Sequence, residues 1–74
     1  MNVTGLIVEF EPGMGEAVFQ GLALLDSVTV YGVRDNKIVV VIEAESVHAI
    51  GGHLKEIEKI DYVTGLSPVY SVSE

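Results

Sequence analysis

The chain has 74 residues and no cysteine, so it is expected to form one small domain, 1–74, without disulfide bonds or thiolate-bound metals. Its net charge of −7, from eleven acidic and four basic residues, would repel phosphate backbones and disfavours a nucleic-acid partner. With 49% hydrophobic residues the chain can fold, and it should still have apolar surface for a partner or a second copy to cover.

Targeting signals are not evident in the sequence. No apolar run reaches the ~18 residues that a membrane helix needs. The N-terminus has neither the basic region nor the apolar region of a secretory signal. We therefore expect no membrane insertion and a cytoplasmic location.

The first expected strand spans residues 3–10. Because side chains alternate across a strand, one face carries Leu6, Val8 and Phe10, and the other carries Val3, Gly5, Ile7 and Glu9. A helix follows, with Pro12 expected in its first turn and Glu16 placed to interact with the helix dipole. The residues of this segment that recur with helical spacing are Met14, Ala17, Val18, Gly21, Leu22 and Leu25.

A hairpin is expected next. Residues 27–33 and 37–44 read as two strands joined by the polar turn 34–36. The five β-branched residues from Ile38 to Ile42 indicate a strand covered at least partly on both faces. The pattern leaves open whether Val30 or Tyr31 faces outward.

A second helix should begin at the cap residue Ser46. Its apolar stripe comprises Val47, Ile50, Leu54 and Ile57. The mid-helix pair Gly51-Gly52 costs about 1 kcal/mol per glycine relative to alanine. Either these glycines and Gly21 let the two helices approach closely, or the helix kinks at the pair. In the last strand, 63–72, Pro68 predicts a sheet edge or a bulge.

The element order βαββαβ predicts an α+β, ferredoxin-like fold. Two right-handed crossovers sharing a central hairpin give a four-stranded antiparallel sheet of order 4-1-3-2, with two helices on one face. The other face is then uncovered. With Glu9 and Glu43 facing outward, Ile7, Val39 and Val41 form an apolar strip between carboxylates. An amphipathic cationic peptide would suit such a strip, and so would a second copy of the chain in a homodimer.

The sequence does not bring together residues that could form a catalytic or metal-binding site. His48 and His53 point in different directions around a helix, and Glu45 and His48 form one isolated Glu-x-x-His pair. The loop after the first strand is acidic, unlike an anion-binding loop. We expect no catalytic residue, no metal ligand and no cofactor, and hence a protein that is not an enzyme.

Two stretches resemble the NapD family. They are IVVVIEAES at 38–46 and IDYVTGLSPVY at 60–70. NapD-like chains carry a matching V-V-V-E-A-E-D segment and end in a V-x-x-V-S-L-V-Y strand. The opening strand and residues 27–30 are similar as well. Departures are a shorter hairpin turn, Pro68 in place of the usual leucine, and shorter termini.

The resemblance implies a cytoplasmic chaperone for the periplasmic nitrate reductase. Such a chaperone binds the twin-arginine signal peptide of the catalytic subunit and holds back export until the molybdenum cofactor is inserted. On this view Ile7, Val39 and Val41 contact the apolar region of the peptide, and Glu9 and Glu43 contact the arginines.

Other βαββαβ modules provide an alternative. Ligand-binding domains of leucine-responsive regulators and ACT domains share this element order and pair through faces or edges. Gly5, Gly65 and acids near the strand ends would then line an amino-acid pocket at a dimer interface. A structural dimer without a ligand is a third interpretation.

Overall fold

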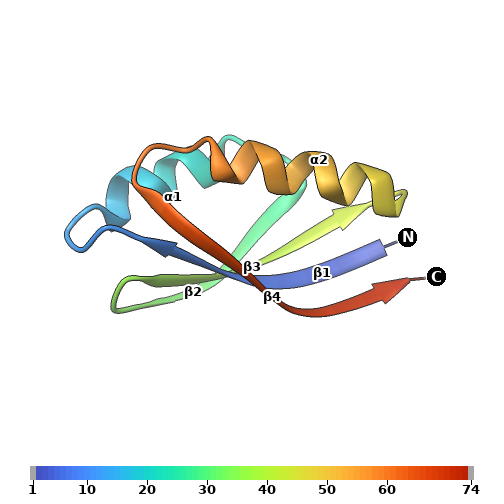
Figure 1. Cartoon of the computed structure of the whole chain (residues 1–74), viewed down its shortest axis with the longest axis horizontal. Helices are drawn as coiled ribbons and strands as arrows, with labels where there is room; N and C mark the ends of the chain where they lie inside the picture. The colour runs from blue at the N-terminus through green and yellow to red at the C-terminus, as the bar shows by residue number, and fades with distance from the viewer. Residues whose placement is uncertain (1, 74) are drawn as a thin grey trace.

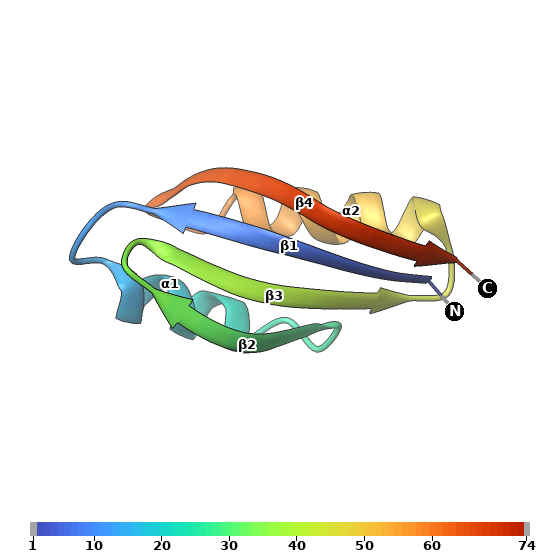
Figure 2. The same cartoon turned by 90° about the horizontal axis from the view of Figure 1, so that it is seen from below.

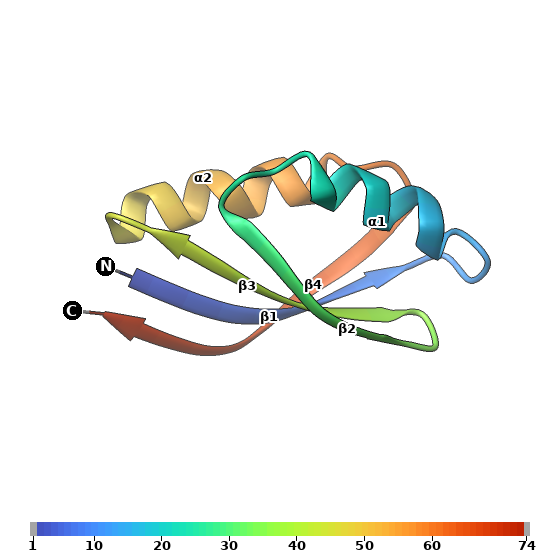
Figure 3. The ribbon, with the colours of Figure 1, turned by 180° about the vertical axis from the view of Figure 1, so that it is seen from behind.

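Six elements follow one another in the computed structural model, which describes residues 2–73. They are β1 (Asn2–Phe10), α1 (Gly15–Ala23), β2 (Val28–Arg34), β3 (Lys37–Ala44), α2 (Val47–Glu58) and β4 (Val63–Ser73). The strands form one antiparallel sheet of order β2-β3-β1-β4. Both helices lie on the same face of this sheet (Figures 1 and 3). The predicted ferredoxin-like fold and its strand order are confirmed.

The core lies between the sheet and the two helices. Alternate residues of β1 and β3 are fully or almost fully buried against the helices, as the alternation predicts. Their outward neighbours are more exposed. The buried apolar residues are Leu6, Val8 and Phe10 of β1, Ile38, Val40 and Ile42 of β3, Val18 and Leu22 of α1, and Ile50 and Ile57 of α2.

The connection from β1 to α1 corrects one prediction. Pro12 does not lie in the first helical turn, because Glu11 to Met14 form a β-turn before the helix. The Met14 N–H donates to the Glu11 carbonyl at 3.0 Å, and Gly13 has a φ of 87°. Proline followed by glycine with positive φ is the pattern of a type II turn. The helix therefore begins only at Gly15, with Glu16 in its first turn as predicted.

Helix α2 begins as the sequence predicts. The Ala49 N–H donates to Ser46 Oγ at 3.1 Å, which satisfies one of the free amides of the first turn. Ile50 and Ile57 are buried and Leu54 is half-buried. Val47 was expected on the buried stripe but is 69% exposed, because it is the first helical residue, beside the end of β3.

The helix glycines have two different environments. A Cβ built on Gly21 would lie 2.9 Å from Ile60 Cγ2, so this glycine permits the close approach of α1 to the segment after α2. Gly51 and Gly52 have no atom within 4 Å of such a Cβ. Gly21 thus permits a close approach of α1 to the segment after α2 and not to α2 itself, and the expectation of close helix packing is wrong at the Gly51-Gly52 pair, where α2 nevertheless runs as one helix from Val47 to Glu58.

Both edge strands contain a register shift. In β4, Tyr70 pairs with Gly5 and Pro68 pairs with Leu6, so Val69 is an extra residue. Pro68 thus lies on an edge strand and beside a bulge, as predicted. In β2, the pairing skips Tyr31. Val30 packs on the core and Tyr31 is 70% exposed, which settles the orientation that the sequence left open.

Candidate functional site

The face of the sheet opposite the helices has no covering element among residues 2–73 (Figure 2). We call it the open face. Its outward residues from β4, β1 and β3 form four rows, numbered from the end where the two chain termini lie side by side. The first row contains Val72, Val3 and Glu43; the second, Tyr70, Gly5 and Val41; the third, Ser67, Ile7 and Val39; the fourth, Gly65, Glu9 and Lys37.

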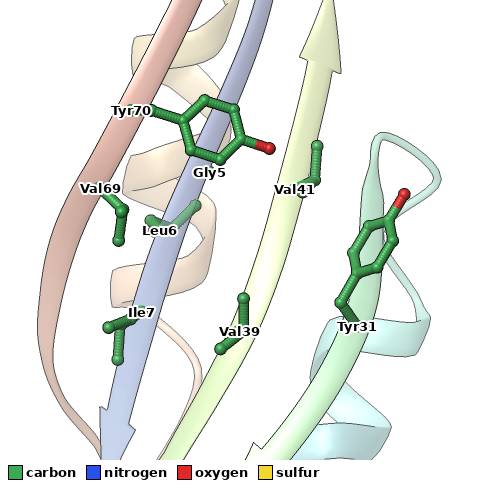
Figure 4. A pocket seen from close by; sticks show the side chains of 8 residues that line it. All are labelled: Gly5, Leu6, Ile7, Tyr31, Val39, Val41, Val69 and Tyr70. Carbon is green, nitrogen blue, oxygen red and sulfur yellow. The ribbon is translucent and has the colours of Figure 1, made fainter.

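A shallow groove occupies the middle of the open face. Its volume is about 480 Å³, and Figure 4 shows the eight residues that line it. These residues carry no charge, and the hydroxyls of two tyrosines are their only polar side-chain groups. Such a surface favours an apolar ligand. The groove residues are Gly5, Leu6, Ile7, Tyr31, Val39, Val41, Val69 and Tyr70.

Tyr70 lies across the floor of the groove. A Cβ on Gly5 would come within 3 Å of three atoms of the tyrosine ring, so the ring can occupy this place only because residue 5 is glycine. The hydroxyl points over β1 toward Val41 (Figure 4). The ring is 49% exposed, and it therefore presents both an aromatic surface and a hydroxyl group to a ligand.

Two tyrosines, one beside a bulge in each edge strand, line the groove from opposite edges of the sheet. Without the extra residue Val69, Tyr70 would share the inward side of β4 with Pro68. On the other edge, Tyr31 follows Val30, which packs on the core, so alternation along β2 turns the tyrosine side chain outward beside the bulge (Figure 4). Sequence reasoning did not identify either tyrosine as a site residue. Pro68 signals an irregular strand in β4, and Gly32, a glycine inside β2 directly after Tyr31, signals one in β2.

The five site residues predicted from the sequence lie in different rows of the open face. Ile7, Val39 and Val41 lie together in the second and third rows and line the groove. Glu43 lies in the first row and Glu9 in the fourth. These two rows are six residue steps apart along β1, from Val3 to Glu9, which corresponds to about 20 Å. The two carboxylates therefore lie at opposite ends of the groove and do not form one site.

Within one chain, the residues of the rival amino-acid pocket lie apart. Gly5 lies in the second row and Gly65 in the fourth, and Gly65 belongs to a separate hollow formed with Glu58, Val63 and neighbouring residues. The groove around Gly5 contains no charged side chain, whereas an amino acid brings an ammonium and a carboxylate group that both need partners.

The histidines lie away from the open face, on α2. His53 Nδ1 is 3.5 Å from Glu56 Oε1, one turn along the helix, and His48 is exposed. Within residues 2–73, no three His, Asp or Glu side chains come together as metal ligands. In the same part of the chain, neither helix has the length and apolar composition to span a membrane.

Comparison with known proteins identifies the family. The model of the NapD protein family matches residues 1–74. The solution structure of the Tat proofreading chaperone NapD from E. coli superimposes with a TM-score of 0.86 at 20% sequence identity, covering 97% of this chain and 78% of that one. No curated protein sequence matched significantly. The structural match supports the fold, and the family match over the whole chain shows that this protein belongs to the NapD family.

Proposed function

We propose that this protein is an assembly chaperone that binds the twin-arginine signal peptide of the catalytic subunit of a periplasmic nitrate reductase. In the cytoplasm, it holds back export until the cofactor of that subunit is inserted. Family membership and the fold shared with a Tat proofreading chaperone support this role. The role requires binding and release of a peptide and no catalytic group.

The observation that carries the proposal is the apolar groove on an otherwise strongly acidic protein. A twin-arginine signal peptide combines two cations with an apolar stretch. The net charge of −7 would speed the encounter with such a peptide. Burial of its apolar stretch on Ile7, Val39 and Val41 would supply most of the affinity.

The edges of the sheet are poorly suited to bind a peptide as an additional strand. Each edge strand is interrupted by a bulge, at Tyr31 in β2 and at Val69 in β4. Pro68 also removes one backbone donor from β4. Because bulges and proline disfavour pairing at an edge, the open face is the better place for a peptide.

The width of the open face suits one helix. The edge strands β4 and β2 are separated by β1 and β3, and three strand spacings amount to about 14 Å. An α-helix with its side chains is about 10–12 Å wide. The peptide would therefore lie as a helix over β1 and β3, in contact with the Tyr70 ring above Gly5 and with Tyr31 at the β2 side.

Calorimetric titration with a synthetic twin-arginine signal peptide of a nitrate reductase tests the proposal. A peptide with both arginines replaced by alanine is the matched control, and Val39→Asp supplies a protein variant with a charge in the groove. We expect micromolar or tighter binding that is weakened by either change. Failure to bind at several temperatures, or equal binding by Val39→Asp, would contradict the proposal.

A further inference from the structure

The two ends of the groove differ in charge. The first row contains Glu43 as its only charged residue. Two more acids flank this end: Glu45 follows β3, and Asp26 precedes Ser27, whose carbonyl accepts the Glu43 N–H at 3.1 Å. All three carboxylate residues are exposed. Among residues 2–73, the first row therefore presents only the negative charge of Glu43 to a cation on the open face.

The fourth row is different because it contains cations. Lys37 lies directly opposite Glu9, and Arg34 of β2 pairs with Lys37 on the same face. The two remaining basic residues, Lys55 and Lys59, lie within α2 and at its end. Both cations of the open face therefore lie in the row of Glu9, Lys37 next to it and Arg34 one strand farther, and they reduce its attraction for an arginine.

We propose that the groove binds the signal peptide in one direction, with the arginine pair at the Glu43 end and the apolar stretch running toward Glu9. This inference rests on the proposed function and deepens it. Of the two acids that sequence reasoning assigned to the arginines, Glu43 is then the partner. Glu9 lies beyond the apolar stretch and has Lys37 as its neighbour.

Tyr70 supplies a second partner at the same end. It lies in the second row, next to the row of Glu43, and its ring covers Gly5 with half of its surface exposed. An arginine guanidinium binds both to carboxylates and to aromatic rings. One arginine of the pair can thus bind Glu43 and the other can stack on Tyr70, while Tyr31 contacts apolar side chains farther along.

The length of the groove agrees with this arrangement. The distance of about 20 Å between the first and fourth rows corresponds to about 13 residues of α-helix. Such a segment holds an arginine pair followed by about three helical turns of apolar residues. The apolar turns then cover Val41 in the second row and next the pair Val39 and Ile7 in the third row.

A spin label on the peptide determines the direction. The protein contains no cysteine, so a single cysteine placed at one end of the peptide reacts alone with the label. A label beside the arginines should broaden the amide NMR signals of Val3, Glu43 and Val72 and leave those of Glu9 and Gly65 sharp. A label at the far end of the apolar stretch should give the opposite pattern.

Two matched pairs of variants test the partners by calorimetry. Glu43→Gln should weaken binding of the twin-arginine peptide by about 5-fold, near the upper end for an exposed ion pair, and Glu9→Gln by less than about 2-fold. Tyr70→Leu should weaken binding by about 3-fold, but only when the peptide retains its arginines. Tyr31→Leu should have the same effect on the arginine and alanine peptides.

The outcomes separate this inference from the proposed function. Binding with the broadening pattern reversed, or a larger loss in Glu9→Gln than in Glu43→Gln, would overturn the direction and leave the chaperone function intact. Equal broadening at both ends from each label would also overturn a single direction. A wild-type protein that binds no twin-arginine peptide would overturn both.

Discussion

The two faces of the sheet are built from alternate residues of the same strands, yet they differ in environment. Val40 is 0% exposed beneath the helices, whereas its neighbour Val39 is 44% exposed on the open face. Both are valines in the same β-strand. The residue type alone therefore does not determine whether a position stabilises the fold or is available for binding. The location of the helices, which cover one face of the sheet, determines it.

The two faces have different roles in the molecule. The covered face supplies most of the stability, because all its central side chains are removed from water. The open face retains apolar groups in contact with water, which a small domain tolerates when a partner is available to cover them. Substitutions on the first face should change unfolding, and substitutions on the second should change binding.

The largest effect is expected from a deletion in the core. Ile38→Ala removes buried methyl groups between β3 and the helices and should lower the free energy of unfolding by about 2–5 kcal/mol. Denaturant titration measures this loss, with Val39→Ala as the exposed neighbour. Equal losses in the two variants would show that the faces do not differ as described.

A second test uses the same substitution on both faces. Val40→Thr places a hydroxyl among apolar side chains without a change of shape and should cost about 1–3 kcal/mol of stability. Val39→Thr should change stability by less than about 0.5 kcal/mol, as exposed substitutions generally do. It should instead weaken peptide binding. A destabilised Val39→Thr protein with normal peptide affinity would contradict the division of the two faces.

A smaller effect is expected where α2 is fixed over the covered face. Ser46→Ala removes the acceptor of the Ala49 N–H and should destabilise the protein by about 1 kcal/mol. Thermal unfolding followed by circular dichroism measures the change. Ser46→Asp, which retains a capping oxygen, should remain close to the wild type, and a loss equal to that of Ser46→Ala would argue against the cap.

The smallest effect compares two glycines in the covering helices. Gly52→Ala meets open space and should stabilise the protein by up to about 1 kcal/mol through helix propensity. Gly21→Ala should destabilise it, because the new methyl group would collide with the branched side chain of Ile60. Chemical denaturation of both variants measures these changes in the free energy of unfolding. A gain of stability at Gly21 would show that this close approach is not required.

Much of the fold could be predicted from the sequence because β1 and β3 are regular. Apart from Gly5, which the Tyr70 ring covers, their apolar residues alternate in burial, and Glu9 and Glu43 indicated which side faces outward. Ile7, Val39 and Val41 were therefore assigned to the open face correctly. Register in such strands is strongly specified because a shift by one residue would expose the core.

The aromatic part of the groove could not be predicted in the same way. A bulge inserts one residue and reverses the facing of the residues after it, and Gly32, which marks the bulge in β2, does not tell which residue is the extra one. The separation of Glu9 from Glu43 also depends on the pairing of β1 with β3, which places Lys37 opposite Glu9 and Val3 opposite Glu43. The alternation of side chains along a strand alone predicts neither the position of a bulge nor the pairing between strands.

Whether the open face is the binding face can be tested by methyl NMR of the protein during titration with a twin-arginine signal peptide. We expect large shifts for Ile7, Val39 and Val41 and small shifts for Val18, Leu22 and Ile57 on the covered side. Shifts concentrated on residues of α1 and α2, with Val39 and Val41 unchanged, would contradict a binding role for the open face.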